Sequence, residues 1–262
     1  MSGTFDLKGR LVLLTGGAGI LGSQMARALV ANGARVALVD RNLAGAQALA
    51  KELGNAARAW DCDVTDPAAV DALQAGIEEA MGPVDTLVNN VATKTENIFA
   101  PFEQFPLDEW DEVMAGNLKS AVICCQRFGA AMARRGTGSI INTLSIYGIV
   151  GPDQRIYEGS EYNGVAINTP EVYSTSKAGL WGLTQYLATY WGHRGVRVNA
   201  ITPGGARSGQ NDTFVSRYSA RVPLGRMAEP QDMAGAVCFL ASDAAAYVTG
   251  HNLVIDGGLT AW

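Results

Sequence analysis

Short apolar runs alternate with longer amphipathic segments along most of this chain of 262 residues. The runs at 11–15, 35–40, 84–90 and 196–203 have the length and apolar character of buried strands. Repetition of strand, helix and strand predicts a parallel sheet that is covered by its connecting helices. We therefore expect an α/β fold, a Rossmann-like doubly wound parallel sheet of about seven strands with helices on both faces.

The rest of the pattern fits the same sheet. One further strand is expected to end near 60–64, and two more to span 138–145 and 252–258. Helices are expected at 20–32, 66–81, 117–135 and 171–192, and another is expected to follow the second strand and to end near residue 53. No linker divides the chain, so residues 1–262 are expected to form one domain. Two segments, about 149–171 and about 204–227, interrupt the alternation after strand ends, where open α/β sheets bind ligands. We expect an insertion and a lid over an active site.

Composition and charge argue against several classes of protein. The net charge of −5 and the lack of a basic run argue against nucleic-acid binding. No apolar stretch approaches the roughly 18 residues that cross a bilayer. The first ten residues lack the apolar centre of a signal peptide, which predicts a cytoplasmic protein. The four cysteines form no CxxC pair, and His193 and His251 stand alone, so neither disulfides nor a metal site is expected.

The sequence TGGAGILG at 15–22 follows the first predicted strand and opens the first predicted helix. Its Gly17, Gly19 and Gly22 give the spacing G-x-G-x-x-G, which permits a tight turn and brings backbone N–H groups close to a pyrophosphate. A merely flexible turn is the alternative, but the strand–helix–strand context favours dinucleotide binding. The cofactor-binding turn is expected to comprise Gly16, Gly17, Gly19, Ile20, Leu21 and Gly22.

Asp40 closes the second predicted strand. A carboxylate there accepts hydrogen bonds from the adenosine ribose hydroxyls and repels a 2′-phosphate. Arg41 acts in the opposite sense, because a guanidinium can hold a 2′-phosphate. Since the glycine turn carries no basic residue to assist Arg41, we expect both residues to lie at the cofactor and NAD to be favoured over NADP.

Tyr173 and Lys177 lie four residues apart on a predicted helix and therefore share one face. A nearby ammonium favours the phenolate and lowers the pKa of a tyrosine, which would let Tyr173 act as a general acid or base. An amphipathic surface pair is the alternative. Ser145 at the end of the fifth predicted strand and the nucleotide turn in the same chain favour a catalytic pair.

Eight motifs in order give the chain a resemblance to the short-chain dehydrogenase/reductase family over essentially its whole length. They are TGGAGILG, CDVTD, VNNVA, GNLKSA, NTLSIYG, YSTSK, VNAITPGG and VTGHNLVIDGG. The resemblance implies an NAD(P)-dependent enzyme that transfers hydride between nicotinamide and a carbonyl or secondary alcohol. It also implies that the segment 236–258 pairs copies of the chain into a homodimer or homotetramer.

The resemblance assigns roles to individual residues. Tyr173 would transfer the proton, Lys177 would bind the nicotinamide ribose and lower the pKa of Tyr173, and Ser145 would hydrogen-bond the substrate oxygen. Asn117 would hold a water in the proton relay. The implied cofactor contacts are Asp63, Val64, Asn90, Val91, Ala92, Pro203 and Gly204.

Three departures from the family pattern stand out. Ile20 occupies the place of the middle glycine, and the resulting spacing is that of the longer, sugar-nucleotide-modifying branch. An epimerase or dehydratase is therefore one alternative, although the chain lacks the extra C-terminal domain of that branch. Val91 and Ala92 replace an Ala–Gly pair, and Ser208 is a candidate for the threonine that follows the Pro–Gly pair.

The interval between Ser145 and Tyr173 is longer than usual in this family by roughly fifteen residues, and the insertion must cross the mouth of the active site. Its polar side chains favour a sugar, polyol or sugar-derived substrate, as does a similarity to members that act in sugar metabolism, including flagellin glycosylation. Arg155, Tyr157 and Lys94 are candidate substrate contacts. The alternatives are an insertion that packs on a neighbouring subunit, a non-sugar ketone such as a 3-oxoacyl or cyclic substrate, and a non-catalytic NAD-sensing protein.

Overall fold

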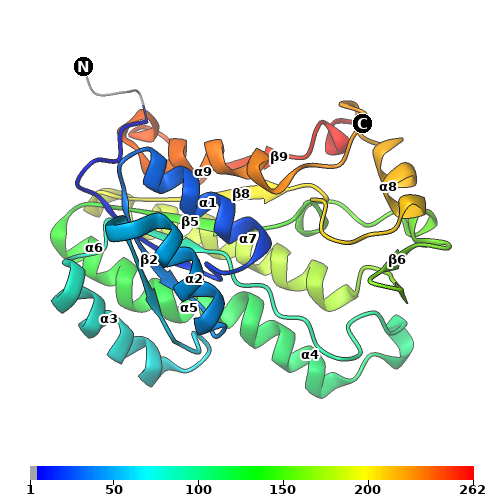
Figure 1. The fold of residues 1–262 in the computed structure, drawn as a ribbon, viewed down its shortest axis with the longest axis horizontal. Coiled ribbons are helices and arrows are strands. Elements are labelled where there is room, and N and C mark those ends of the chain that lie inside the picture. The colour runs from blue at the N-terminus through cyan, green and yellow to red at the C-terminus, as the bar shows by residue number, and fades with distance from the viewer. Residues whose placement is uncertain (1–4) are drawn as a thin grey trace.

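A computed structural model describes residues 5–262 (Figure 1). Its strands are β1 (Leu11–Thr15), β2 (Arg35–Val39), β3 (Ala57–Trp60), β4 (Thr86–Asn89), β5 (Gly138–Thr143), β6 (Glu161–Tyr162), β7 (Val165–Ala166), β8 (Val196–Pro203) and β9 (Asn252–Ile255). Its helices are α1 (Ile20–Ala31), α2 (Leu43–Leu53), α3 (Pro67–Met81), α4 (Leu107–Met114), α5 (Ser120–Cys124), α6 (Ala130–Arg135), α7 (Glu171–Trp191), α8 (Asp212–Ser219) and α9 (Ala234–Ala241).

Seven strands form one sheet in the order β3-β2-β1-β4-β5-β8-β9. Every neighbouring pair is parallel. The strand order reverses between β1 and β4, and a crevice at the carboxyl ends of the strands at such a point is where doubly wound sheets bind their ligands. The predicted fold class is confirmed.

The two faces of the sheet are buried by different helices. Leu11 and Leu13 of β1 pack with residues of α3, α6 and α7, whereas Val12 and Leu14 pack with residues of α1, α2 and α9. Successive side chains of a strand point to opposite faces, so a strand that is covered on both sides is apolar throughout. That is why β1 is a continuous apolar run without alternation.

The helix expected at 117–135 begins ten residues earlier than predicted, because helical structure continues from α4 through α5 to α6. π-helical turns at Ala115–Lys119 and Cys125–Gly129 join the three helices. Such turns often mark functional sites, since they displace one residue from the regular helical hydrogen bonding. Helix α9 was not among the expected helices. It is apolar on all sides and buried, and therefore lacks the amphipathic period that identified the others.

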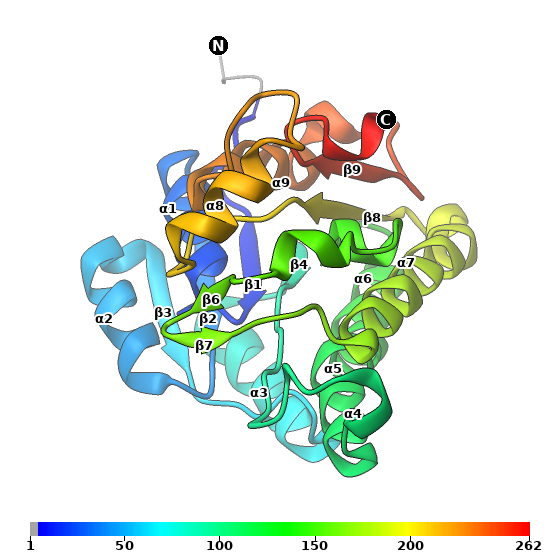
Figure 2. The same cartoon turned by 90° about the vertical axis from the view of Figure 1, so that its right-hand side faces the viewer.

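The two irregular segments contain local structure and contact each other. The insertion at 149–171 carries the hairpin of β6 and β7, and the lid at 204–227 carries α8. Backbone N–H groups join them, since Asn163 donates to the carbonyl oxygen of Gly209 at 3.3 Å and Asn211 donates to that of Glu161 at 3.0 Å. Figure 2 shows the hairpin beside α8, in front of the sheet.

Within residues 5–262, no helix is both long enough and apolar enough to cross a membrane. The same residues contain no group of three or more His, Cys, Asp or Glu side chains arranged to hold a metal ion. All four cysteines are buried as free thiols. Burial raises the pKa of Cys62 to about 11 and that of Cys125 to about 12.

Candidate active site

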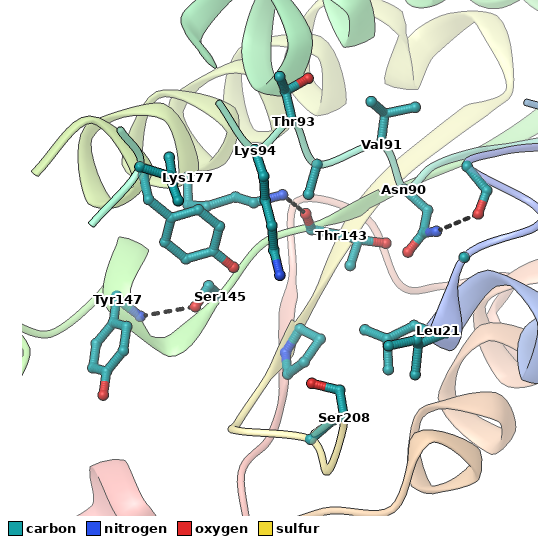
Figure 3. A pocket seen from close by; sticks show the side chains of 18 of the residues that line it. Leu21, Asn90, Val91, Thr93, Lys94, Thr143, Ser145, Tyr147, Lys177 and Ser208 are labelled. Atoms are coloured by element: carbon teal, nitrogen blue, oxygen red, sulfur yellow. Dashed lines mark hydrogen bonds between the residues drawn. The ribbon is translucent and has the colours of Figure 1, made fainter. Parts of the chain in front are cut away.

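A cavity of about 660 Å³ opens at the carboxyl edge of the sheet. The glycine turn, the segments that follow β2, β3, β4, β5 and β8, the start of α7, the insertion and the lid all line it. Figure 3 shows lining residues from the glycine turn, the segments that follow β4 and β5, α7 and the lid. A volume of this size lies within the range of small-molecule and cofactor sites, and its place at the strand-order reversal fits a nucleotide.

The glycine turn is shaped by two close approaches. Gly16 has a φ of +64°, which L side chains rarely adopt, and a Cβ on Gly22 would lie 2.2 Å from the carbonyl oxygen of Gly16. Gly19 caps α1 without a side-chain hydrogen bond, which leaves the first N–H groups of the helix facing the cavity. This cradle fits a pyrophosphate group.

The structure divides the predicted turn residues into two groups. Gly16, Gly19, Ile20 and Leu21 line the cavity, and so does Ala18, which the motif did not indicate. Gly17 and Gly22 do not line it. Gly17 lies instead against Leu38 and Leu14, where a Cβ would meet the Leu38 side chain at 3.1 Å, so its role is to pack the turn on β1 and β2.

Asp40 and Arg41 both line the nucleotide end of the cavity, as does Asn42. The carboxylate of Asp40 accepts hydrogen bonds from the backbone N–H groups of Ala18 and Asn42, each at 2.9 Å. Asp40 is therefore held against the glycine turn. This orientation places a negative charge at the end of β2, the position where a ribose hydroxyl is recognised in such folds.

The expected wall of the nucleotide end is also present. Asp63, Val64, Asn90, Val91 and Ala92 all line the cavity. Hydrogen bonds from the backbone and side chain of Thr65 lower the pKa of Asp63. The side-chain amide of Asn90 donates to the carbonyl oxygen of Gly16 at 3.2 Å, which joins the end of β4 to the glycine turn (Figure 3).

Ser145, Tyr173 and Lys177 meet at one end of this cavity. Ser145 follows β5, and its hydroxyl accepts a hydrogen bond from the backbone N–H of Tyr147 at 3.2 Å (Figure 3). The Tyr173 side chain lies near enough to the Ser145 hydroxyl for the serine to lower its pKa. Lys177 is 2% exposed, and its ammonium donates to the carbonyl oxygen of Thr143 at 2.8 Å.

The expected lowering of the Tyr173 pKa is not what the structure shows. Burial is the largest influence and raises the pKa of Tyr173, and the nearby Ser145 hydroxyl opposes this rise. The Lys177 ammonium lies 5.8 Å from the centroid of the Tyr173 ring. Burial lowers the pKa of Lys177 itself to about 8. Spacing along a helix predicted the pairing correctly but carries no information on desolvation.

Asn117 does not line the cavity. It lies in the first π-helical turn and is 2% exposed. Its side-chain oxygen accepts from the backbone N–H of Thr93 at 2.7 Å, and its amide donates to the hydroxyl of Ser176 at 3.1 Å. Asn117 therefore ties the segment after β4 to α7, one residue before Lys177.

The predicted substrate contacts divide in the same way. Lys94 lines the cavity, whereas Arg155 and Tyr157 do not. Pro203 and Gly204, which were expected at the cofactor, also line it, as does Ser208. The Arg155 side chain is 84% exposed and forms a salt bridge with Asp153 at 2.8 Å. The geometry therefore corrects the expectation of a substrate contact at Arg155. A loop side chain within reach of a cavity can turn outward when a carboxylate lies two residues away, and sequence does not reveal this.

Tyr157 supports the cavity wall from behind. Its hydroxyl donates to that of Tyr147 at 2.9 Å and also hydrogen-bonds Thr169, and both of these partners line the cavity. Tyr157 does not line the cavity, and its wall instead includes polar residues that the sequence did not indicate. They are Tyr147, Asn168, Thr169 and Gln210. The proximity of Tyr147 to Ser145 in sequence was the one available signal.

A parallel doubly wound sheet with a dinucleotide turn and a Ser–Tyr–Lys group at its carboxyl edge defines a nicotinamide-dependent oxidoreductase. Residues 17–260 match the family model described as enoyl-(acyl carrier protein) reductase. The chain belongs to the short-chain dehydrogenase/reductase family and is an NAD(P)-dependent dehydrogenase that acts on CH–OH groups.

Several relatives and solved structures resemble the chain over nearly its whole length. D-threitol dehydrogenase of Mycolicibacterium smegmatis is 38% identical, over 98% of this chain and 95% of that protein. A short-chain dehydrogenase from Leptospira borgpetersenii with bound NAD+ superposes with a TM-score of 0.87 at 34% identity, over 98% of this chain and 95% of the other. A gluconate 5-dehydrogenase from Burkholderia cenocepacia in complex with NADP and tartrate has a TM-score of 0.87 at 30% identity, over 99% of this chain and 98% of the other.

Proposed function

We propose that this enzyme interconverts a secondary alcohol and a ketone on a sugar, polyol or sugar-derived substrate with NAD as its cofactor. The observation that carries the proposal is the lining of the cavity near Ser145 and Tyr173. Hydroxyl and amide groups line it from the segment after β5 (Tyr147), the insertion (Asn168 and Thr169) and the lid (Ser208 and Gln210). Such groups can hydrogen-bond several substrate hydroxyls at once.

The names of the relatives support the same substrate class. Threitol is a four-carbon polyol and gluconate is a sugar acid, and the enzymes named for them resemble this chain at 38% and 30% identity. Both substrates carry several adjacent hydroxyl groups. A site that recognises such molecules must offer more polar partners than the reaction itself requires.

The preference for NAD rests on Asp40. Two backbone N–H groups hold its carboxylate beside the glycine turn, where a 2′-phosphate would meet a fixed negative charge. Arg41 lines the same end and would favour NADP. We give Asp40 the greater weight because the structure orients its charge.

The catalytic roles follow from the geometry at the reacting end. We propose that Ser145 and Tyr173, which line the same end of the cavity, both bind the substrate oxygen, and that Tyr173 transfers its proton. Lys177 would orient the ribose and assist proton movement from its buried position. We keep Asn117 as a candidate that holds a water of the proton relay near Ser176. The cofactor supplies the hydride acceptor or donor when it is bound.

A non-sugar ketone is the second candidate substrate. Apolar side chains also line the cavity, including Ile98, Phe99, Ile167 and Phe214, and would suit a cyclic or acyl substrate. One experiment separates the two. Polyols, sugars, keto-sugars and cyclic or 3-oxoacyl ketones are assayed by NADH absorbance, with NAD and NADP in parallel. Turnover confined to the cyclic or acyl compounds would refute the proposed substrate class.

We also propose that the chain assembles with copies of itself. Large side chains are exposed on α7, where Tyr186 and Tyr190 stack with ring centroids 5.6 Å apart, and in the C-terminal segment at Tyr247. Exposed aromatic groups of this kind are enriched at protein interfaces. Light scattering coupled to size-exclusion chromatography distinguishes a monomer from a dimer or tetramer.

A further inference from the structure

Lys94 extends into the active-site cavity from the segment that follows β4 (Figure 3). Its ammonium lies 4.2 Å from the centroid of the Tyr162 ring, within the range of a cation–π interaction. None of the salt bridges formed within residues 5–262 involves Lys94. The positive charge is therefore positioned by an aromatic ring and not neutralised by a carboxylate.

Both members of this pair are held in place by separate elements. The backbone N–H of Thr93 donates to the side chain of buried Asn117 at 2.7 Å, which fixes the chain one residue before Lys94. Tyr162 belongs to the hairpin of the insertion, and the next residue, Asn163, donates its backbone N–H to Gly209 of the lid. The ammonium and the ring therefore meet where three segments converge on the cavity.

The charges that line the cavity are unevenly distributed. The lining carboxylates belong to Asp40 and Asp63, which follow β2 and β3 at the nucleotide end. The lining cations near the reacting end are Lys94 and Lys177. Lys177 already donates to the carbonyl oxygen of Thr143. The substrate end thus has an excess of positive charge, with Lys94 as the cation that is available to a ligand.

We propose that Lys94 is a specificity-determining residue that binds the carboxylate of a polyhydroxy acid, with Tyr162 as the residue that positions it. The inference rests on the proposed function, because it selects one chemical class among sugar-derived alcohols. A charge-assisted hydrogen bond from a pre-positioned ammonium distinguishes an acid from a neutral polyol with the same carbon skeleton.

A carboxylate fits this arrangement better than a phosphate. Phosphate sites in proteins combine several donors, such as a guanidinium fork or a row of backbone N–H groups at a helix N-terminus. Among the residues that line the substrate end, the structure offers one free ammonium and no arginine. A single lysine matches the single charge of a carboxylate.

The test compares matched substrates in matched variants. The ratio of kcat/KM for acid over neutral polyol is measured for D-threonate against D-threitol and for D-gluconate against D-glucitol, with D-glucitol 6-phosphate as a dianionic probe. The variants are Lys94→Met, which keeps the length of the side chain, and Tyr162→Leu and Tyr162→Phe, of which only the second keeps the ring. Lys51→Met, an exposed lysine of α2 that does not line the cavity, is the control.

We expect wild-type enzyme to prefer the acid of at least one pair. Lys94→Met should lower the acid-to-polyol ratio by about 10–100-fold, as removal of a charged hydrogen bond does. Tyr162→Leu should lower it by about 2–5-fold and Tyr162→Phe by less, because the phenylalanine ring still attracts the ammonium. Lys51→Met should leave the ratio unchanged.

The outcomes separate this inference from the function on which it rests. Turnover of polyols with no preference for acids, or an equal loss for acid and polyol in Lys94→Met, overturns the role of Lys94 alone. A preference for the phosphate ester that disappears in Lys94→Met overturns the choice of carboxylate. No turnover of any polyhydroxy compound by wild-type enzyme overturns the proposed function and the inference together.

Discussion

The ammonium of Lys177 donates a 2.8 Å hydrogen bond to the backbone carbonyl oxygen of Thr143. This contact ties α7, which carries Tyr173, to the end of β5, which precedes Ser145, and both of these residues line the cavity. It also keeps a charged group in a nearly water-free position, where burial lowers the pKa of Lys177 to about 8. Burying Lys177 in this position therefore carries a cost in stability.

That cost predicts a pH-dependent stability. Below about pH 8 both the folded and the unfolded chain hold the Lys177 proton, so the full cost of burying the charge is present. Between there and the ordinary lysine pKa of 10.5, the unfolded chain keeps a proton that the folded chain has lost, and stability rises with pH. In the wild-type protein this effect should raise the free energy of unfolding by about 2–3 kcal/mol between pH 7 and pH 10, and Lys177→Met should abolish that rise.

Urea unfolding of the cofactor-free protein at the two pH values measures this effect. The difference between wild type and Lys177→Met isolates the lysine from other groups that titrate in the same range, such as Cys62, whose pKa is raised to about 11. Parallel pH dependence in the two proteins would show that the Lys177 charge is not desolvated in the folded state. Activity should be lost in the variant at both pH values.

Tyr173→Phe tests the proton transfer. The variant keeps the ring and its packing but has no proton to move, so kcat should fall by about 10²–10⁴-fold. Binding of NADH, followed by fluorescence, should change by less than about threefold, since one neutral hydrogen bond at most is lost. An active Tyr173→Phe enzyme would rule out Tyr173 as the acid or base.

Asp40→Asn tests the cofactor preference. The substitution removes the negative charge with little change in shape. Ala18 and Asn42 donate to different oxygens of Asp40, so the single oxygen of asparagine keeps one of these two hydrogen bonds. The ratio of kcat/KM with NADP to that with NAD should rise by about 10–100-fold. Arg41→Ala is the complementary variant, and it should lower the same ratio. A wild-type enzyme that prefers NADP would contradict the role given to Asp40.

The sequence predicts the sheet, and the presence of Tyr173 and Lys177 in one cavity, because both follow local rules. An apolar run such as Leu11–Thr15 reports burial on both faces, and the spacing of Tyr173 and Lys177 reports a shared helix face. Helix α9 does not follow such rules, since a helix that is apolar on all sides has no polar face to reveal its period.

The substrate end is harder to predict because it depends on tertiary contacts. Arg155 is drawn outward by Asp153, and Tyr157 binds Tyr147 instead of entering the cavity. The contact between Lys94 and Tyr162 joins a loop after β4 to an insertion far along the chain. No periodicity or motif specifies which polar side chains of an irregular segment face inward.

Gly22→Ala tests the glycine turn. The added Cβ would lie 2.2 Å from the carbonyl oxygen of Gly16, a backbone atom that cannot move without shifting the turn. We expect NADH affinity to fall at least about tenfold and the free energy of unfolding to fall by about 1–3 kcal/mol.

Gly182→Ala is the matched control, because Gly182 lies within α7 and a Cβ there would meet no atom within 4 Å. Alanine in place of glycine at an exposed position within a helix should raise the free energy of unfolding by about 0.5–1 kcal/mol. The affinity for NADH should stay unchanged. Thermal unfolding with and without NADH measures both quantities. If both variants bind NADH like wild type, the close approach of α1 to the turn does not shape the nucleotide site.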